Sequence, residues 1–586
     1  MVLVAILFLI VQSISYLTPP FQSPDEFHHL DRAYLLSKGE VFLESSNKVT
    51  GGDIDTGLLD YMNNFGGLRF KYEKKITAQA YQLSENIQWS GQRKFIGLPN
   101  TAAYFPISYI PQALALSIGG HAGLSVRHSY YLARLFSLMA TLGILWAAFL
   151  LYPVPLIVVA FFVTPMTLFQ LGSASLDAVS FAVTVLFASL YMRGTNNAYK
   201  FDSKMHIAFA ICLFALVTTR INLIPLTLLP IVLYATRKNR IYLVSTFVLI
   251  SLSFAWIGFV LKTVQGLSVR TLTTTEIIKF YLEHPVDFYH VFIATITDSG
   301  ILKHYWSMFI GILGWLDTPL PQSAYIIYGV LLTALAFISF QRNRFCLQNG
   351  NCLSLAIATA PSIFLIFVIQ LACWTNHPAK VIEGIQGRYF TPIFILLSFA
   401  VFNRRLSQLE IKIGLSVVFI MALLSVSIMG PTLRDRYWLS SNYSGYLDLD
   451  KENGTYKMQP SAQLSSSMPL QLMVTSGHRE YEAGLERIGV MFGTYVRQNP
   501  GEAELRLKGP DGAEFVQRFS LPDLADNKYR YFDLDSKRYV SGEIVSITGD
   551  GVSTWESHSE KGGVNTCITY EYNNGKRRFT PGCPLF

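Results

Sequence analysis

The sequence predicts a polytopic α-helical membrane protein that ends in a β-rich domain outside the membrane. Of its 586 residues, 51% are hydrophobic and only 15% are charged, well below the roughly 25% charged residues usual in soluble domains. Long apolar runs follow one another from Met1 to about residue 430, whereas residues 431–586 alternate short apolar and polar segments. We therefore expect a transmembrane domain at 1–430 and a separate C-terminal domain at 431–586.

About eleven transmembrane helices are expected. The first is Met1–Leu17, which lacks a basic start and a cleavage site and so favours a retained span over a signal peptide. The others are expected near Ser129–Leu151, Pro155–Leu171, Ser175–Met192, Met205–Thr218, Asn222–Tyr234, Ile241–Leu261, Ser323–Phe340, Leu353–Cys373, Tyr389–Phe402 and Ile413–Ile428. Several are shorter than the roughly 20 residues of a straight crossing, which is tolerated where the backbone faces protein or a water-filled cavity.

The distribution of Lys and Arg predicts the orientation. The short basic loops at 193–204, 237–240, 342–344 and 404–405 fall on one side of the membrane if the N-terminus is cytoplasmic. The opposite side then carries a first outer loop at 18–125, a second outer loop at 264–322 and the whole C-terminal domain.

The C-terminal domain reads as β-sandwich-like, because short alternating runs are separated by Gly- and Pro-rich turns. Cys567 and Cys583 are its only cysteines, and Asn574-Gly575 between them is a hairpin turn signal. A disulfide between them is expected if the domain lies in an oxidising compartment; the alternative is two free thiols in a cytoplasmic tail. The chain contains no Walker pattern, nucleic-acid module or metal-like Cys/His spacing.

The candidate site begins at Ser23-Pro24-Asp25-Glu26, where the chain has just left the first span. This stretch is a strong helix start, with Ser23 as the expected cap, Pro24 at the first helical position and Glu26 completing a capping box. The alternative is that Asp25 and Glu26 only neutralise a helix N-terminus. A helix N-terminus would also make Asp25 a weaker base, since it stabilises the ionised carboxylate.

Four more charged residues fall on the same expected face of the membrane. Asp177 lies at the outer end of a span, and Arg220, Lys303 and Arg388 lie at the outer ends of spans or in the second outer loop. For each of them, an interfacial position, a plain ion pair or a headgroup contact is an alternative explanation. Ionisable residues near membrane depth are nevertheless candidates for function. Acids beside cations suit a reaction that activates a hydroxyl group and binds a phosphate leaving group.

Several spaced motifs resemble one bacterial membrane-protein family. They are Pro24-Asp25-Glu26 with His29 and Arg32, Tyr104-x-Pro106-x-x-Tyr109-x-Pro111, Ala133-Arg134, Ser175-x-Asp177, Gly314-Trp315-Leu316-Asp317 and Gly387-Arg388-Tyr389-Phe390. Together they resemble the family called domain of unknown function 2142, which is similar to the GT-C glycosyltransferases. The resemblance covers about residues 1–430 and does not extend to the C-terminal domain.

The resemblance implies an inverting glycosyltransferase of GT-C type. Its donor would be a sugar, such as glucose or another hexose, on polyprenyl (undecaprenyl) phosphate, and its acceptor O-antigen or a similar surface glycan. It would act on the periplasmic face of the bacterial inner membrane, without a cofactor or divalent metal. A flippase and a sugar-lipid synthase would act upstream. Two alternatives stay open: a polysaccharide ligase or polymerase that uses a diphosphate-linked glycan, and a lipid-linked-sugar transporter.

The same resemblance assigns roles to three acidic residues. Asp25 would be the catalytic base with Glu26 beside it, and Asp177 a second site acid. Substrate-binding residues are expected at His28, His29, Arg32, Tyr104, Arg220, Lys303, His304, Gln386, Arg388 and Tyr389. Arg220, Lys303 and Arg388 are assigned to the lipid phosphate on electrostatic grounds alone.

Overall fold

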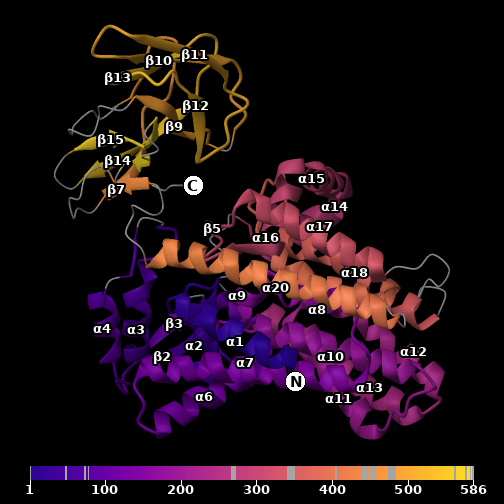
Figure 1. Ribbon diagram of the computed structural model, residues 1–586. Helices are drawn as coiled ribbons and strands as arrows, with labels where there is room; N and C mark the ends of the chain where they lie inside the picture. Colours follow the sequence, from indigo (N-terminus) through magenta and orange to yellow (C-terminus); the bar gives the residue numbers. More distant parts are fainter. Residues whose placement is uncertain are drawn as a thin grey trace. The chain divides into compact units, whose positions relative to one another are not determined.

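The computed structural model describes residues 2–46, 49–71, 74–76, 78–264, 272–339, 350–402, 406–438, 446–448, 456–472, 484–495, 497–559, 563–573, 577–580 and 582–583. They form two compact units (Figure 1). Unit 1 comprises Met1–Gly67 and Thr77–Leu433, and unit 2 comprises Leu68–Ile76 and Arg434–Phe586. The expected basic loops at 342–344 and 404–405 lie outside the described residues.

Six helices of the described chain are long and apolar enough to cross a membrane. They are α7 (Val126–Leu151), α10 (Asp177–Thr195), α13 (Arg240–Thr263), α17 (Gln322–Ser339), α18 (Gly350–Cys373) and α20 (Gln408–Tyr437). Four shorter apolar helical segments accompany them, at Val4–Leu17, Ser203–Thr219, Ile221–Arg237 and Gly387–Val401. The protein is thus a helical membrane protein, but fewer described helices reach the length of a full crossing than the eleven expected spans.

Proline and backbone breaks explain the shorter segments. The expected span at 155–171 divides into α8 (Leu156–Phe161) and α9 (Pro165–Leu171), because Pro165 begins a new helix after a break. Pro225 likewise lies inside the 3₁₀ segment η2 (Ile221–Leu228), which precedes α12 (Leu229–Arg237). The first helix, α1 (Val2–Leu17), has 16 residues, about 24 Å at 1.5 Å per residue.

The remaining elements of unit 1 lie mostly in the two expected outer loops. They are α2 (Glu26–Ser37), β1 (Glu44–Ser46), β2 (Val49–Asp55), α3 (Thr56–Gly66), α4 (Ala78–Glu85), β3 (Arg93–Gly97), α5 (Pro99–Ala102), η1 (Pro106–Tyr109), α6 (Ile110–His121), α11 (Ser203–Thr219), α14 (Thr274–Glu283), α15 (Pro285–Thr297), α16 (Ser299–Gly311), β4 (Ile312–Leu313), β5 (Thr318–Pro319), η4 (Gly387–Phe390) and α19 (Thr391–Val401).

The antiparallel sheet β1-β2-β3 within the first loop was not expected from the sequence. Its register requires glycine, since a Cβ at Gly51 would lie 1.9 Å from the carbonyl oxygen of Ile96.

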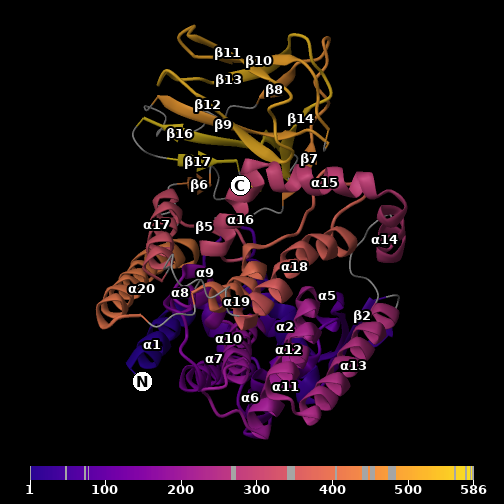
Figure 2. The same cartoon turned by 90° about the vertical axis from the view of Figure 1, so that its right-hand side faces the viewer.

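Helix α10 is the central helix of unit 1. It packs against α7, α11 and α19, and α7 in turn packs against α6 (Figure 2). Most of its membrane-length window, 83%, is buried inside the protein, so it is surrounded by protein and not by lipid. Helix α2 packs on α6, which brings the start of the first loop to the helices around α10.

Unit 2 contains a two-sheet β-sandwich (Figure 2). One sheet has the order β11-β10-β13-β8, and the other has the order β15-β14-β9-β16-β17-β6, with β12 paired to β9 and β7 paired to β14. The strands are β6 (Tyr446–Asp448), β7 (Tyr456–Pro460), β8 (Leu470–Leu472), β9 (Leu485–Gly493), β10 (Glu502–Lys508), β11 (Glu514–Ser520), β12 (Lys528–Asp533), β13 (Ser541–Ser546), β14 (Ser553–Ser559), β15 (Val564–Thr566), β16 (Ile568–Tyr572) and β17 (Arg577–Phe579). Inward-facing side chains of both sheets form one apolar core, as alternation in half-buried strands requires.

Unit 2 also includes a segment from the first loop. Ile76 donates its backbone N–H to the carbonyl of Tyr437 at 2.7 Å, and the Lys75 ammonium donates to the carbonyl of Asp435 at 2.6 Å. The buried Arg436 donates to the carbonyl of Leu68 at 2.6 Å. The sequence alone did not suggest that residues 68–76 belong with the C-terminal chain.

Cys567 and Cys583 form a disulfide in unit 2, with their Cα atoms 5.6 Å apart. Strands β16 and β17 are antiparallel neighbours, as a hairpin between the cysteines requires. The turn residues Asn574-Gly575 lie outside the described residues.

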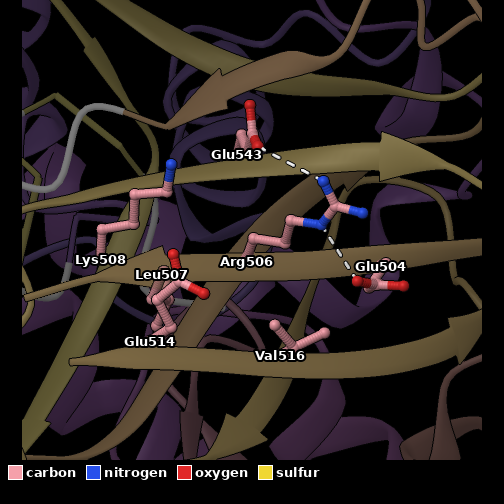
Figure 3. Close-up of a pocket in the computed structure, with 7 residues that line it drawn as sticks. All are labelled: Glu504, Arg506, Leu507, Lys508, Glu514, Val516 and Glu543. Atoms are coloured by element: carbon pink, nitrogen blue, oxygen red, sulfur yellow. Dashed lines mark hydrogen bonds and ion pairs between the residues drawn. The ribbon is translucent and has the colours of Figure 1, made fainter. Parts of the chain in front are cut away.

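A groove of about 290 Å³ lies over β10, β11 and β13 and is lined mainly by charged side chains (Figure 3). Arg506 forms ion pairs there with Glu504, at 3.0 Å, and with Glu543, at 3.9 Å. These charges neutralise one another, so the groove presents no concentration of one charge to a ligand.

Candidate active site

Asp25 occupies a strained position at the start of α2. Its φ of 62° is in the left-handed region, which few residues other than glycine, asparagine and aspartate adopt. The expected cap is wrong: α2 begins at Glu26, and the Ser23 hydroxyl donates to the Gln170 side chain at 3.0 Å instead of accepting from the helix. Local backbone strain of this kind persists where the surrounding structure fixes it and clusters at functional sites.

The carboxylate of Asp25 lies at one end of a chain of four alternating charges. Arg388 Nη2 is 2.9 Å from Asp25 Oδ2, and Arg388 Nη1 is 3.1 Å from Asp177 Oδ2. Arg220 then pairs with the other oxygen of Asp177. The order is therefore Asp25, Arg388, Asp177, Arg220, and we call these residues the charge chain.

Burial differs sharply along the charge chain. The side chains of Arg388, Asp177 and Arg220 are 3%, 7% and 9% exposed, whereas the Asp25 side chain is 33% exposed. Asp25 is thus the member of the charge chain that an incoming molecule reaches first.

Local backbone structure positions the two arginines. A Cβ at Gly387 would lie 2.2 Å from the backbone nitrogen of Phe309 in α16, so only glycine lets η4 approach α16 at this point. Arg388 follows directly and also donates to the carbonyl of Pro24 at 3.5 Å. Arg220 sits at the break between α11 and η2, where its Nε donates to the Ser180 hydroxyl at 2.8 Å.

Aromatic side chains and one histidine surround the charge chain. His29 Nδ1 is 2.7 Å from the Tyr109 hydroxyl, and the His29 ring stacks on Tyr104 with centroids 6.3 Å apart. Burial lowers the pKa of His29 to about 4, although the charges of Asp25 and Asp177 oppose that shift. His29 is therefore neutral at neutral pH. Burial also raises the pKa of Tyr104, and the charge of Asp25 adds to that rise.

Glu26 takes no part in the charge chain. Its side chain is fully buried and pairs with Arg134, with 3.1 Å between Arg134 Nε and Glu26 Oε1. The adjacent acids Asp25 and Glu26 therefore have different partners, and only Asp25 is accessible.

Three other expected site residues lie in η4, beside η4 or in α2. Tyr389 and Gln386 lie in and beside η4, with the Arg388 guanidinium 5.7 Å from the Tyr389 ring centroid. His28 is half-buried in α2, the next residue before His29.

The charge chain does not include the expected residues Arg32, Lys303 and His304 either. The buried Arg32 donates to the carbonyls of Glu40 and Val41, at 3.1 and 2.6 Å, and so fixes the turn after α2. Lys303 and His304 are exposed side chains of α16.

Sequence reasoning did not assign a role to Arg134, Tyr109 or Tyr130. Arg134 was visible as a charged residue within the apolar run that became α7, and such residues are functional candidates by default. Tyr130 donates to Glu26 Oε1 at 2.9 Å, a contact between residues more than one hundred positions apart that no local pattern reveals.

The site has the groups for transfer onto a hydroxyl. The accessible carboxylate of Asp25 suits a base or an orienting acceptor for a hydroxyl proton. The two arginines suit the oxygens of a phosphate, which guanidinium groups bind bidentately. Among the residues that the structure describes, no group of three or more His, Cys, Asp or Glu side chains could hold a metal ion.

Comparisons with known proteins identify the family. The family model described as "Predicted membrane protein (DUF2142)" matches residues 7–397. No curated protein sequence matches the chain.

Among solved structures, the chain is similar to ArnT from Cupriavidus metallidurans bound to undecaprenyl phosphate, with a TM-score of 0.32 and 13% identity over 74% of this chain and 77% of that chain. The apo state of ArnT gives a TM-score of 0.29 and 12% identity over 73% and 77%. The arabinosyltransferase EmbB from Mycobacterium smegmatis gives a TM-score of 0.22 and 10% identity over 96% of this chain and 64% of that chain. These likenesses are distant, so we base the function on the geometry of the site itself.

Proposed function

Given that the chain belongs to the DUF2142 family of predicted membrane proteins, we propose that it is an inverting glycosyltransferase with a polyprenyl-phosphate sugar as donor. The observation that carries this proposal is the charge chain, in which one accessible carboxylate is linked through Arg388 to a buried second acid and a second arginine.

The proposed reaction is a single displacement at the anomeric carbon. The acceptor hydroxyl oxygen forms a bond to that carbon, and the bond from the carbon to the phosphate oxygen breaks with its electron pair. Asp25 accepts the hydroxyl proton, or orients the hydroxyl group as the proton leaves. One displacement inverts the configuration of the sugar.

The two arginines would act on the leaving group. A sugar phosphodiester carries one negative charge, and the polyprenyl phosphate that departs carries a second one. Arg388 and Arg220 are held in place by Asp177 before the reaction begins, and positioned cations stabilise charge that develops in the transition state.

We place the reaction on the periplasmic face of the bacterial inner membrane, with a cytoplasmic N-terminus. The positive-inside pattern of the basic loops supports this orientation, and the disulfide in unit 2 fits an oxidising compartment. The donor sugar is proposed to be a hexose such as glucose, and the acceptor O-antigen or a similar glycan. A synthase and a flippase would supply the lipid-linked sugar.

Reconstitution tests the proposal. The purified chain in proteoliposomes is incubated with undecaprenyl phosphate glucose and an isolated O-antigen acceptor, with and without a chelator of divalent metals. We expect transfer that inverts the anomeric centre and is unaffected by chelation. Transfer only from a diphosphate-linked glycan would instead favour a ligase or polymerase, and movement of intact lipid-linked sugar without transfer would favour a transporter.

A further inference from the structure

The buried ion pair between Glu26 and Arg134 lies directly beside the charge chain without being part of it. We infer that this pair is a clamp that positions Asp25 relative to Asp177, and that Glu26 is a positioning residue rather than a second catalytic acid. The roles given to Asp25 and Glu26 in this inference rest on the proposed function. The claim that the ion pair positions Asp25 relative to Asp177 does not depend on any reaction.

The carboxylate of Glu26 has no capacity left for a substrate. Oε1 accepts hydrogen bonds from Tyr130 at 2.9 Å, Arg134 Nε at 3.1 Å and the Ala174 backbone N–H at 2.8 Å. Oε2 accepts from Arg134 Nη2 at 3.2 Å and from the Ser23 backbone N–H at 3.4 Å. A carboxylate offers about four acceptor positions, and five donors already share them on a fully buried side chain.

Arg134 connects this carboxylate to the end of α1. Its Nη1 donates to the carbonyls of Ser15 and Thr18, at 3.1 and 3.2 Å, and its Nη2 donates to the carbonyl of Pro19 at 3.4 Å. These carbonyls belong to the chain that leaves α1 and reaches Asp25 a few residues later. A planar guanidinium with five donors in a fixed fork fits this cradle, whereas a lysine ammonium does not.

The other side of the clamp reaches the segment before α10. Ala174, which donates to Glu26, lies three residues before Asp177. The Ser15 hydroxyl also donates to the carbonyl of Gly172 in the same segment, at 3.0 Å. One buried ion pair therefore holds both segments from which the acids of the charge chain emerge, and Glu26 is the immediate neighbour of Asp25.

Two variants loosen the clamp without changing its net charge. Arg134→Lys keeps the positive charge but loses the fork, and Glu26→Asp shortens the carboxylate by one methylene so that it no longer spans Arg134 and Ala174. The matched control is Arg237→Lys. Arg237 donates to the carbonyls of Gly194, Asn196 and Tyr199 at 2.7 to 3.0 Å, and takes no part in the charge chain.

The first measurement is steady-state transfer with undecaprenyl phosphate glucose. We expect both clamp variants to lower kcat by roughly 10- to 100-fold, as for a misplaced catalytic group, while the donor KM stays within about threefold because the arginines of the charge chain are untouched. Arg237→Lys should leave both constants near those of the unmodified protein.

The second measurement needs no activity. A Cβ at Gly172 would lie 3.5 Å from the Cβ of Ser15, at the short end of the roughly 3.5–4.5 Å range for disulfides. The pair Ser15→Cys and Gly172→Cys should therefore form a crosslink under mild membrane-permeant oxidation. Addition of Arg134→Lys or Glu26→Asp should slow that crosslink severalfold, and addition of Arg237→Lys should not.

The possible outcomes distinguish a failure of the clamp from a failure of the proposed function. A fall in kcat with an unchanged crosslinking rate would overturn the clamp, because turnover would then depend on this ion pair without any change in how the two segments are held. Slower crosslinking with unchanged kcat would also overturn it, since the segments would then move without consequence. If the unmodified protein transfers no sugar, the proposed function fails, and the crosslinking rates alone then decide whether the ion pair holds the two segments.

Discussion

Replacement of Asp25 by asparagine separates the role of this carboxylate in chemistry from its role in the fold. The Asp25 side chain is 33% exposed, and its partner Arg388 keeps a second ion pair with Asp177 at 3.1 Å. Loss of the Asp25 charge therefore leaves no buried arginine without a partner. We expect the free energy of unfolding to change by no more than about 1 kcal/mol, the usual range for partly exposed pairs.

The effect on turnover should be far larger. A positioned base typically contributes 10²- to 10⁴-fold in rate, which corresponds to about 3 to 5 kcal/mol of transition-state stabilisation. Donor binding should persist or tighten, because Arg388 loses its competing partner.

Asp177→Asn is the matched control for the effect on stability, because it removes a buried acid of the same charge chain. Asp177 is 7% exposed and bridges Arg388 and Arg220, so its loss leaves two buried guanidinium groups short of a counter-charge. Removal of one partner from a buried ion pair typically costs about 3 to 5 kcal/mol, and we expect this variant to unfold at a clearly lower temperature.

The assay combines turnover with undecaprenyl phosphate glucose in nanodiscs, thermal unfolding followed by intrinsic fluorescence, and titration with the donor lipid. Asp25→Asn with near-normal turnover would refute the catalytic assignment. Asp177→Asn as stable as the unmodified protein would refute the electrostatic account of the charge chain.

Further predictions address other parts of the structure. Arg220→Ala should weaken donor binding more than acceptor binding in parallel titrations; equal losses would remove it from the phosphate site. Gly387→Ala should lower the unfolding temperature and turnover together, since the new methyl group would meet the α16 backbone at 2.2 Å; normal values of both would contradict the close approach. The pKa of about 4 for His29, below the ordinary 6.5, means that the unfolded chain binds the proton first as pH falls. Stability should therefore decline from pH 6.5 to pH 4, by about 2 kcal/mol at pH 5, and His29→Asn should flatten that decline. In intact cells, a membrane-impermeant thiol reagent should label Cys567 and Cys583 only after reduction; labelling that requires permeabilised membranes would refute an outward C-terminal domain.

The sequence predicted the parts of this architecture that depend on local pattern. Apolar runs identified the helical membrane domain, and short alternating runs identified the β-rich domain. The sequence also singled out Asp25, Asp177, Arg220 and Arg388, since charged residues at the ends of apolar runs are conspicuous. Their pairing into one chain depends on contacts across hundreds of residues, such as Arg388 with Asp25, and no spacing rule predicts it.

The local rules failed where tertiary contacts prevailed. Ser23 has the ideal sequence context for a helix cap, yet its hydroxyl bonds to Gln170, and the start of α2 moves to Glu26. The Glu26 carboxylate does accept the Ser23 backbone N–H at 3.4 Å, as a capping box requires, but it also pairs with the buried Arg134, and the Ser23 hydroxyl does not complete the box. Lys303 lies in the expected second outer loop as an exposed residue of α16, and its assignment to the lipid phosphate stays a prediction.

The segment Leu68–Ile76 bears on how the protein is made. It belongs to unit 2, yet the residues on both sides of it belong to unit 1. Lys75 donates a hydrogen bond to the carbonyl of Asp435, which is 360 positions away in the sequence. During synthesis this segment emerges long before the residues that will bind it, and contacts so distant in sequence form slowly. Completion of the first loop therefore waits for translation beyond Arg436. A truncation at Leu433 would leave this stretch of the first loop without the carbonyls of Asp435 and Tyr437 that accept its hydrogen bonds.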